Sequence, residues 1–198
     1  MKKEVQKHRS SKGLRSVGGN GDGVSLDLFA GIDRITQIGN RVAFKDKLHK
    51  AQNKAEQAEE SISVLMIDLD HMKKYNEIYG YLEGDCRLKE IAGILSDEMR
   101  RKDDFVARLY GGTFACLLPN SSLEDAVKIA ERIRHAVFTR AMVHQGALKD
   151  QVVTVSIGVT SEVPRRGEDM ELIINRAETA LFEAKQRGMN CVEPYGES

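Results

Sequence analysis

The sequence predicts one α/β (α+β) domain, in which helices pack on a central β-sheet, preceded by a basic tail. Three observations support this prediction. Helical and strand-like segments alternate along the chain, 198 residues suffice for one hydrophobic core, and apolar residues become periodic only from Leu26 onward. The predicted boundaries are therefore residues 1–24 for the tail and residues 25–198 for the domain.

Composition excludes several classes of protein. Residues 1–24 contain almost no large apolar side chain, so we expect a flexible tail. The 30 basic side chains balance the 30 acidic ones, so the net charge does not indicate binding to nucleic acid or membrane. The cysteines Cys86, Cys116 and Cys191 lack the CxxC spacing of a zinc site and suit a reducing compartment. With no apolar run long enough for a bilayer and no signal-peptide pattern, we expect a soluble cytoplasmic protein.

The first half of the domain is predicted to contain a helix, a strand and two further helices. Asn40 can cap a helix that runs to about residue 59. The β-branched and aliphatic segment 61–67 is typical of a buried strand in the middle of a sheet. The two following helices are expected at about 72–78 and 84–100.

The second half is predicted to begin with a β-hairpin. Strands at 105–109 and 113–118 flank the turn Tyr110-Gly111-Gly112. The last elements are a helix, a strand, an amphipathic helix and a short strand, expected at 119–140, 151–159, 168–187 and near 191.

Several segments together resemble GGDEF domains, the catalytic domains of diguanylate cyclases. They follow the family's order and comprise DRITQIGNR at 33–41, DLDHMKKYN at 68–76, Gly80 with Gly84-Asp85, VTVSIG at 153–158 and AETALFEAKQRGMN at 177–190. The resemblance implies the palm-like fold of nucleotidyl cyclases, with a mostly antiparallel sheet surrounded by helices. A shared fold does not by itself define the activity.

The catalytic signature of this family is altered. The resemblance implies that two domains meet and join two GTP molecules, using divalent metal ions held by carboxylates. Asp68 matches one such ligand, but Gly112 and Thr113 replace the acidic residues of the signature in the alignment that keeps Arg108 and Phe114. We therefore expect no bound metal, no cofactor and no turnover, with Mg²⁺ present only if GTP still binds.

A vestigial GTP site is also implied by the resemblance. Lys73 and Lys185 match phosphate-binding lysines, and Asn76 and Asp85 match the residues that recognise the guanine edge. Met189 replaces an arginine that contacts phosphate, so one bidentate clamp is lost. The alternative interpretation is that Asn76 and Asp85 are ordinary polar caps at helix ends.

A second nucleotide site is implied just before the hairpin. Arg101-Lys102-Asp103-Asp104 resembles the RxxD motif at which relatives bind cyclic di-GMP, and Arg132 matches a second arginine of that site. A guanidinium suits guanine O6 and N7, and a carboxylate can accept from guanine N1 and N2. The alternative is an exposed ion pair between Arg101 and Asp104 that contributes little to stability.

The leading functional hypothesis is a catalytically inactive receptor that binds cyclic di-GMP and signals through an unidentified protein. Because each copy offers an RxxD face, the ligand can also bridge a homodimer. The first alternative is a weakly active diguanylate cyclase or a GTP-binding regulatory domain. The second is a protein-interaction scaffold that is independent of nucleotide.

Overall fold

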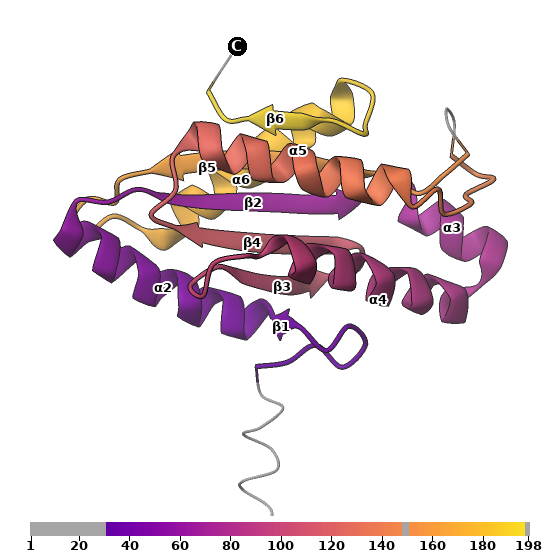
Figure 1. The fold of residues 1–198 in the computed structure, drawn as a ribbon, viewed down its shortest axis with the longest axis horizontal. Coiled ribbons are helices and arrows are strands. Elements are labelled where there is room, and N and C mark those ends of the chain that lie inside the picture. The colour runs from indigo at the N-terminus through magenta and orange to yellow at the C-terminus, as the bar shows by residue number, and fades with distance from the viewer. Residues whose placement is uncertain (1–30, 148–150, 197–198) are drawn as a thin grey trace, which may run out of the picture.

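A six-stranded sheet forms the centre of the structure, a computed structural model that describes residues 31–147 and 151–196 (Figure 1). In spatial order the strands are β1 (Gly39–Asn40), β3 (Phe105–Tyr110), β4 (Thr113–Pro119), β2 (Ile62–Leu69), β5 (Val155–Glu162) and β6 (Val192–Pro194). The four middle strands are antiparallel, and both edge strands pair in parallel. The mostly antiparallel palm-like sheet is thereby confirmed. The predicted tail and its boundary lie outside the described residues.

The central strand β2 is buried on both faces because apolar side chains occupy both phases of its alternation. Leu65, Ile67 and Leu69 belong to one core cluster, and Val64 and Met66 belong to the other. This explains why the sequence shows a continuous apolar run here rather than an alternating one.

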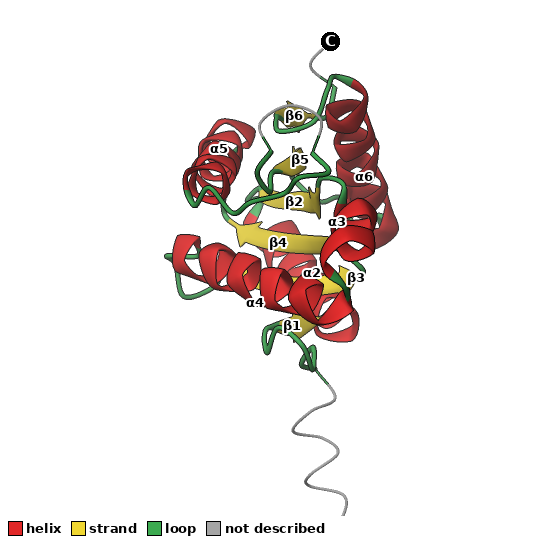
Figure 2. Ribbon diagram, turned by 90° about the vertical axis from the view of Figure 1, so that its right-hand side faces the viewer, coloured by secondary structure: helices red, strands yellow, loops and turns green. Residues whose placement is uncertain are grey.

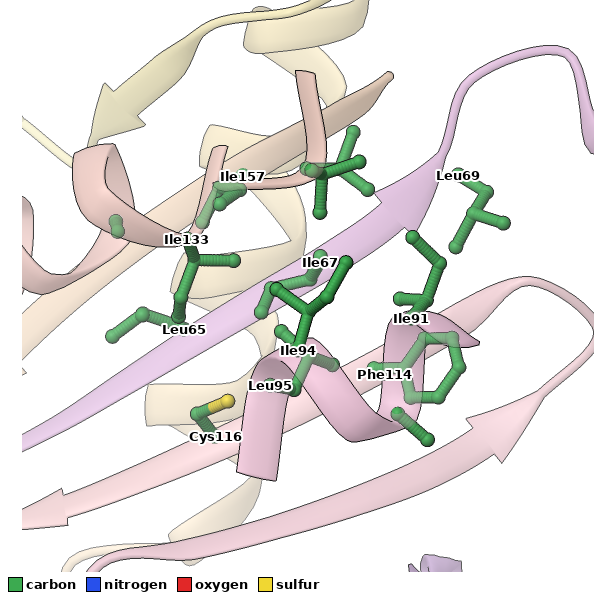
Figure 3. Close-up of a cluster of buried hydrophobic side chains, with 14 of the residues drawn as sticks. Leu65, Ile67, Leu69, Ile91, Ile94, Leu95, Phe114, Cys116, Ile133 and Ile157 are labelled. Atoms are coloured by element: carbon green, nitrogen blue, oxygen red, sulfur yellow. The ribbon is translucent and has the colours of Figure 1, made fainter. Parts of the chain in front are cut away.

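Helices cover both faces of the sheet (Figure 2). They are α2 (Arg41–Ala58), α3 (Met72–Tyr79), α4 (Tyr81–Glu98), α5 (Leu123–Thr139) and α6 (Met170–Gln186). The helices α4 and α5 enclose the core of Figure 3, whereas α2 and α6 enclose the second core on the other face. Among the described residues, no helix has both the length and the apolar character needed to cross a membrane.

Most predicted elements are present, with shifted ends. Asn40 caps α2 as predicted, since its side chain accepts from the backbone N–H of Ala43. Helix α4 begins at Tyr81 rather than 84, because Gly80 adopts a φ of 86° and turns the chain sharply after α3. Strand β5 begins only at Val155, because the residues before it pair with the loop after α5.

The strand β1 was not predicted, and the reason is its length. Two residues cannot display a period, so nothing in the sequence distinguishes them from a loop. Gly39 allows this strand to lie against β3, because a Cβ there would stand 2.5 Å from the Phe105 ring.

Helix α6 lies unusually close to the sheet at Gly158 of β5. A Cβ at this position would stand 2.2 Å from the backbone carbonyl oxygen of Ala177 and the backbone nitrogen of Leu181. The glycine therefore permits a close approach of helix and strand. This packing brings the C-terminal turn of α6, with Lys185, to the end of β2.

Candidate functional site

The predicted functional residues form two groups at opposite ends of the sheet. Strands β2 and β3 both pair antiparallel with β4, so they run in the same direction. Asp68 near the end of β2 therefore lies beside the hairpin turn, whereas Arg101, which precedes β3, lies at the other end.

At the hairpin end, Lys185 occupies the space next to the carboxylate of Asp68. Its Nζ lies 2.9 Å from Asp68 Oδ2, 3.2 Å from the Asp68 backbone oxygen and 2.5 Å from Asp70 Oδ1. Thr113, paired directly opposite Asp68, donates its hydroxyl to Asp68 Oδ1 at 2.8 Å. We call Asp68, Asp70, Thr113 and Lys185 the Lys185 cluster. In it, Asp68 shares the Lys185 ammonium with Asp70 and accepts a hydrogen bond from the Thr113 hydroxyl.

The carboxylate of Asp70 is fully engaged within the protein. Its side chain is 2 % exposed and accepts from the hydroxyls of Thr154 at 2.6 Å and Ser156 at 2.7 Å, and from the backbone N–H of Asn190 at 3.1 Å. Together with Lys185, these donors satisfy both oxygens. A buried charge of this kind requires such partners.

The residues present do not fit the metal site that the resemblance implies. A divalent ion needs several oxygen ligands with net negative charge. Here position 113 supplies a neutral hydroxyl, position 112 supplies no side chain, and the Lys185 ammonium already contacts Asp68. Across the described ranges 31–147 and 151–196, no cluster of three or more His, Cys, Asp or Glu side chains could hold a metal.

Arg108 holds the hairpin turn. Its Nε and one terminal nitrogen donate to the backbone oxygen of Gly111 at 3.0 and 2.8 Å, and its other terminal nitrogen pairs with Asp33 at 3.2 Å. Burial raises the pKa of Asp33, but hydrogen bonds from Thr36 and Arg108 outweigh burial and lower that pKa below its usual value. Arg108 thus has a structural function that the alignment alone did not reveal.

The residues that match the guanine site are brought together between α3 and α4. The Asn76 Oδ1 atom is buried without a hydrogen-bond partner among the described residues, and Gly84 packs directly against it. Asp85 follows Gly84 on α4 and is half-buried. Neither residue is a helix cap, so the capping interpretation is wrong. Lys73 is exposed on α3 and forms no ion pair with another described residue.

At the opposite end of the sheet, Arg101 and Asp104 close a tight turn. The backbone N–H and Nε of Arg101 donate to the two Asp104 oxygens at 3.0 and 3.2 Å, and one terminal nitrogen donates to the Asn120 backbone oxygen at 3.1 Å. The Arg101 side chain is 46 % exposed, whereas that of Asp104 is 3 % exposed. We call residues 101–104 the RxxD turn.

Arg132 of α5 is held beside this turn by Glu98, a residue that the sequence did not indicate. Glu98 ends α4, three residues before Arg101, and its carboxylate accepts from Arg132 Nε at 2.8 Å. The Glu98 backbone oxygen also accepts from one terminal nitrogen of Arg132 at 3.4 Å. A pair separated by 34 residues has no local sequence pattern, which explains why the role of Glu98 was missed.

Comparison with protein families gives a match over most of the chain. The family model described as the GGDEF domain of diguanylate cyclases matches residues 30–191. Diguanylate cyclase A of Treponema denticola is 39 % identical over 140 residues, which cover 71 % of this chain and 37 % of that protein. The response regulator PleD of Caulobacter vibrioides is 33 % identical over 192 residues, which cover 97 % of this chain and 41 % of PleD. The chain thus spans less than half the length of these relatives.

Solved structures share the fold. The coiled coil and GGDEF domain of DgcB from Caulobacter crescentus, in complex with c-di-GMP, superposes with a TM-score of 0.78 at 29 % identity, covering 86 % of this chain and 88 % of that one. The diguanylate cyclase SiaD from Pseudomonas aeruginosa, in complex with its activator SiaC, gives a TM-score of 0.74 at 30 % identity. This superposition covers 86 % of this chain and 64 % of the SiaD chain.

We predict that Lys185→Met destabilises the protein by about 2–4 kcal/mol, because the buried Asp70 carboxylate loses the one cation that pairs with it among the described residues. Urea denaturation gives the free energy of unfolding. The control is Lys73→Met, at an exposed lysine that forms no ion pair in the part of the chain that the structure describes, and it should change stability by less than about 0.5 kcal/mol. Equal effects of the two variants would contradict a structural role for the Lys185 cluster.

Proposed function

Because this chain belongs to the GGDEF family of diguanylate cyclase domains, we propose that it is a catalytically inactive member that binds cyclic di-GMP at its RxxD turn and signals through a protein partner. The observation that carries this proposal is the contrast between the two ends of the sheet. At the hairpin end the acidic residues are bonded to Lys185 and to neighbouring hydroxyl and backbone donors, whereas the arginines at the other end keep donors available to a ligand.

The Lys185 cluster supports the loss of catalysis. Phosphoryl transfer by diguanylate cyclases requires a divalent ion, which neutralises the triphosphate and activates the attacking hydroxyl. In this chain the ammonium of Lys185 is shared between Asp68 and Asp70, and Thr113 supplies a neutral hydroxyl in place of a carboxylate and donates it to Asp68. We therefore propose that the domain needs no metal or other cofactor.

The geometry of the arginines supports ligand binding. One terminal nitrogen of Arg101, Nη2, and one of Arg132, Nη1, have no hydrogen-bond partner among the described residues, and both side chains are more than two fifths exposed. Guanidinium groups held on one edge present the other edge to a base, which suits bidentate recognition of guanine O6 and N7.

Asp104 enters this proposal in a second step. Its carboxylate is buried and both oxygens accept from Arg101, so guanine N1 and N2 can reach it only after the Arg101 side chain turns outward. Replacing the 3.2 Å bond from Arg101 Nε by two bonds from guanine compensates for that movement.

The relatives support the ligand and the signalling role. The DgcB domain was solved in complex with c-di-GMP, and SiaD was solved in complex with an activator protein. By analogy we propose cyclic di-GMP as the ligand, a cytoplasmic signalling protein as the partner, and a ligand-bridged homodimer as a further state of the liganded domain.

A second candidate function is residual binding of GTP, and the buried Asn76 Oδ1 without a partner favours it. Such an atom gains a hydrogen bond when a guanine N–H reaches it. This candidate predicts GTP binding that Asn76→Ala removes.

Turnover is tested separately by chromatography. We expect that the protein makes no cyclic di-GMP from GTP with Mg²⁺ or Mn²⁺. Formation of a product that Asp68→Ala abolishes would instead establish a weakly active cyclase.

The main test is isothermal titration with cyclic di-GMP. We expect a dissociation constant in the low micromolar range, and Arg101→Ala should weaken binding at least about tenfold, or about 1.4 kcal/mol, because base recognition is lost. The control is Arg140→Ala, which removes the same charge from an exposed arginine at the end of α5. Wild-type binding weaker than about 100 µM, or equal binding by the two variants, would refute the receptor proposal and favour the scaffold.

A second prediction concerns Glu98. We expect Glu98→Ala to weaken cyclic di-GMP binding by about five- to tenfold, because Arg132 loses the carboxylate that orients it, with partial recovery in Glu98→Gln. Glu131→Ala is the matched control, since Glu131 holds Arg134 of the same helix at the same 2.8 Å distance. Tighter binding by Glu98→Ala would instead identify Glu98 as a competitor of the ligand.

A further inference from the structure

A groove of about 630 Å³ lies between α2 and the RxxD turn, and the four residues of that turn form one side of it. The α2 residues that line it are three or four positions apart, so they form one face of the helix. They are Lys47, Lys50, Ala51, Lys54, Ala55 and Ala58. The facing wall is the turn between α4 and β3, which lies beside α2 in Figure 1.

The rim of the groove carries excess positive charge. Five basic side chains line it against three carboxylates, those of Glu60, Asp103 and Asp104. Asp104 is already neutralised by Arg101, and Asp103 reaches Lys54 only at 3.9 Å between exposed side chains. Lys50 and Lys102 are exposed and have no carboxylate within ion-pair distance in residues 31–147 and 151–196. The groove is therefore complementary to a negatively charged occupant.

The floor of the groove is apolar. Ala51, Ala55 and Ala58 of α2 line it, and Phe105, Leu117 and Pro119 contribute from the sheet. Small side chains on a helix let another backbone approach closely. Lys47 lies over the Phe105 ring, 5.5 Å from its centroid, and thereby covers one end of the floor.

We propose that this groove binds an acidic, amphipathic helical segment of a protein partner. Apolar side chains of that segment pack on the alanine floor, in the manner of a helix in a groove. Its carboxylates pair with Lys50 and Lys54, which stand one helical turn apart, about 6 Å along α2. Carboxylates one turn apart on the partner match that spacing.

Arg101 links this surface to the proposed ligand. It belongs to the groove wall and to the RxxD turn, so its outward movement on binding cyclic di-GMP changes the wall that the partner contacts. Binding of the acidic segment is independent of the proposed function, but this coupling rests on it. Linkage requires that each ligand alter the affinity of the other by the same factor.

The test uses the whole chain and a fluorescein-labelled synthetic helix with leucines along one face and glutamates along the other. We expect anisotropy titration to give a dissociation constant on the order of 10 µM that weakens as salt is raised. A second peptide with lysines in place of the glutamates should not bind. Saturating cyclic di-GMP should shift the affinity for the acidic peptide by at least about threefold.

Two variants identify the groove. Lys50→Glu with Lys54→Glu should weaken peptide binding at least about tenfold, and Ala58→Trp should do the same by filling the floor without changing charge. The matched control is Lys74→Glu with Lys89→Glu, an equal charge change at exposed lysines of α3 and α4. Circular dichroism checks that all variants fold.

The outcomes separate the two proposals. Peptide binding by wild type that only the groove variants lose supports the docking surface, even if cyclic di-GMP does not bind and the receptor proposal fails. If the Lys74 and Lys89 control loses peptide binding equally, the effect arises from the net charge of the protein rather than from the groove, and the inference is overturned. Loss of cyclic di-GMP binding in the Lys50 and Lys54 variant, with peptide binding intact, would assign the groove to the nucleotide and also overturn it.

Discussion

The contact of Lys185 with Asp68 and Asp70 is the interaction on which the chemistry of the hairpin end depends. One ammonium lies within 2.9 Å of one carboxylate and 2.5 Å of the other, and it connects the last turn of α6 to the end of β2. Because Asp70 is buried, this cation cannot leave without a large electrostatic cost. The carboxylates of Asp68 and Asp70 are therefore engaged in contacts within the protein.

This contact depends in turn on close packing between helix and sheet. Gly158 lets the backbone of α6 approach β5, and Thr154 and Ser156 of the adjoining segment supply the hydroxyls that complete the shell of Asp70. Thr113 then donates its hydroxyl to Asp68, whose side chain is 29 % exposed. The buried Asp70 carboxylate is satisfied on both oxygens, and a satisfied polar network rigidifies its surroundings.

The other end of the sheet has a different character because its polar groups are only partly satisfied. The guanidinium groups of Arg101 and Arg132 are each oriented by one carboxylate and one backbone oxygen, and each retains donors. Orienting bonds of this kind reduce the entropy lost on binding. The RxxD turn and the Lys185 cluster thus lie at opposite ends of the strands and are built from different residues.

The sequence by itself determined the order of elements, the hairpin turn and the absence of carboxylates at positions 112 and 113, because these follow from local composition and periodicity. It also indicated Arg101, Asp104 and Arg132, because their positions match the RxxD site of the GGDEF family. Tertiary packing alone buries Asp104, places Glu98 against Arg132 and brings Lys185 to both Asp68 and Asp70. Lys185 and Asp70 are 115 residues apart, and such contacts arise from the packing of helices on the sheet, which no local pattern encodes.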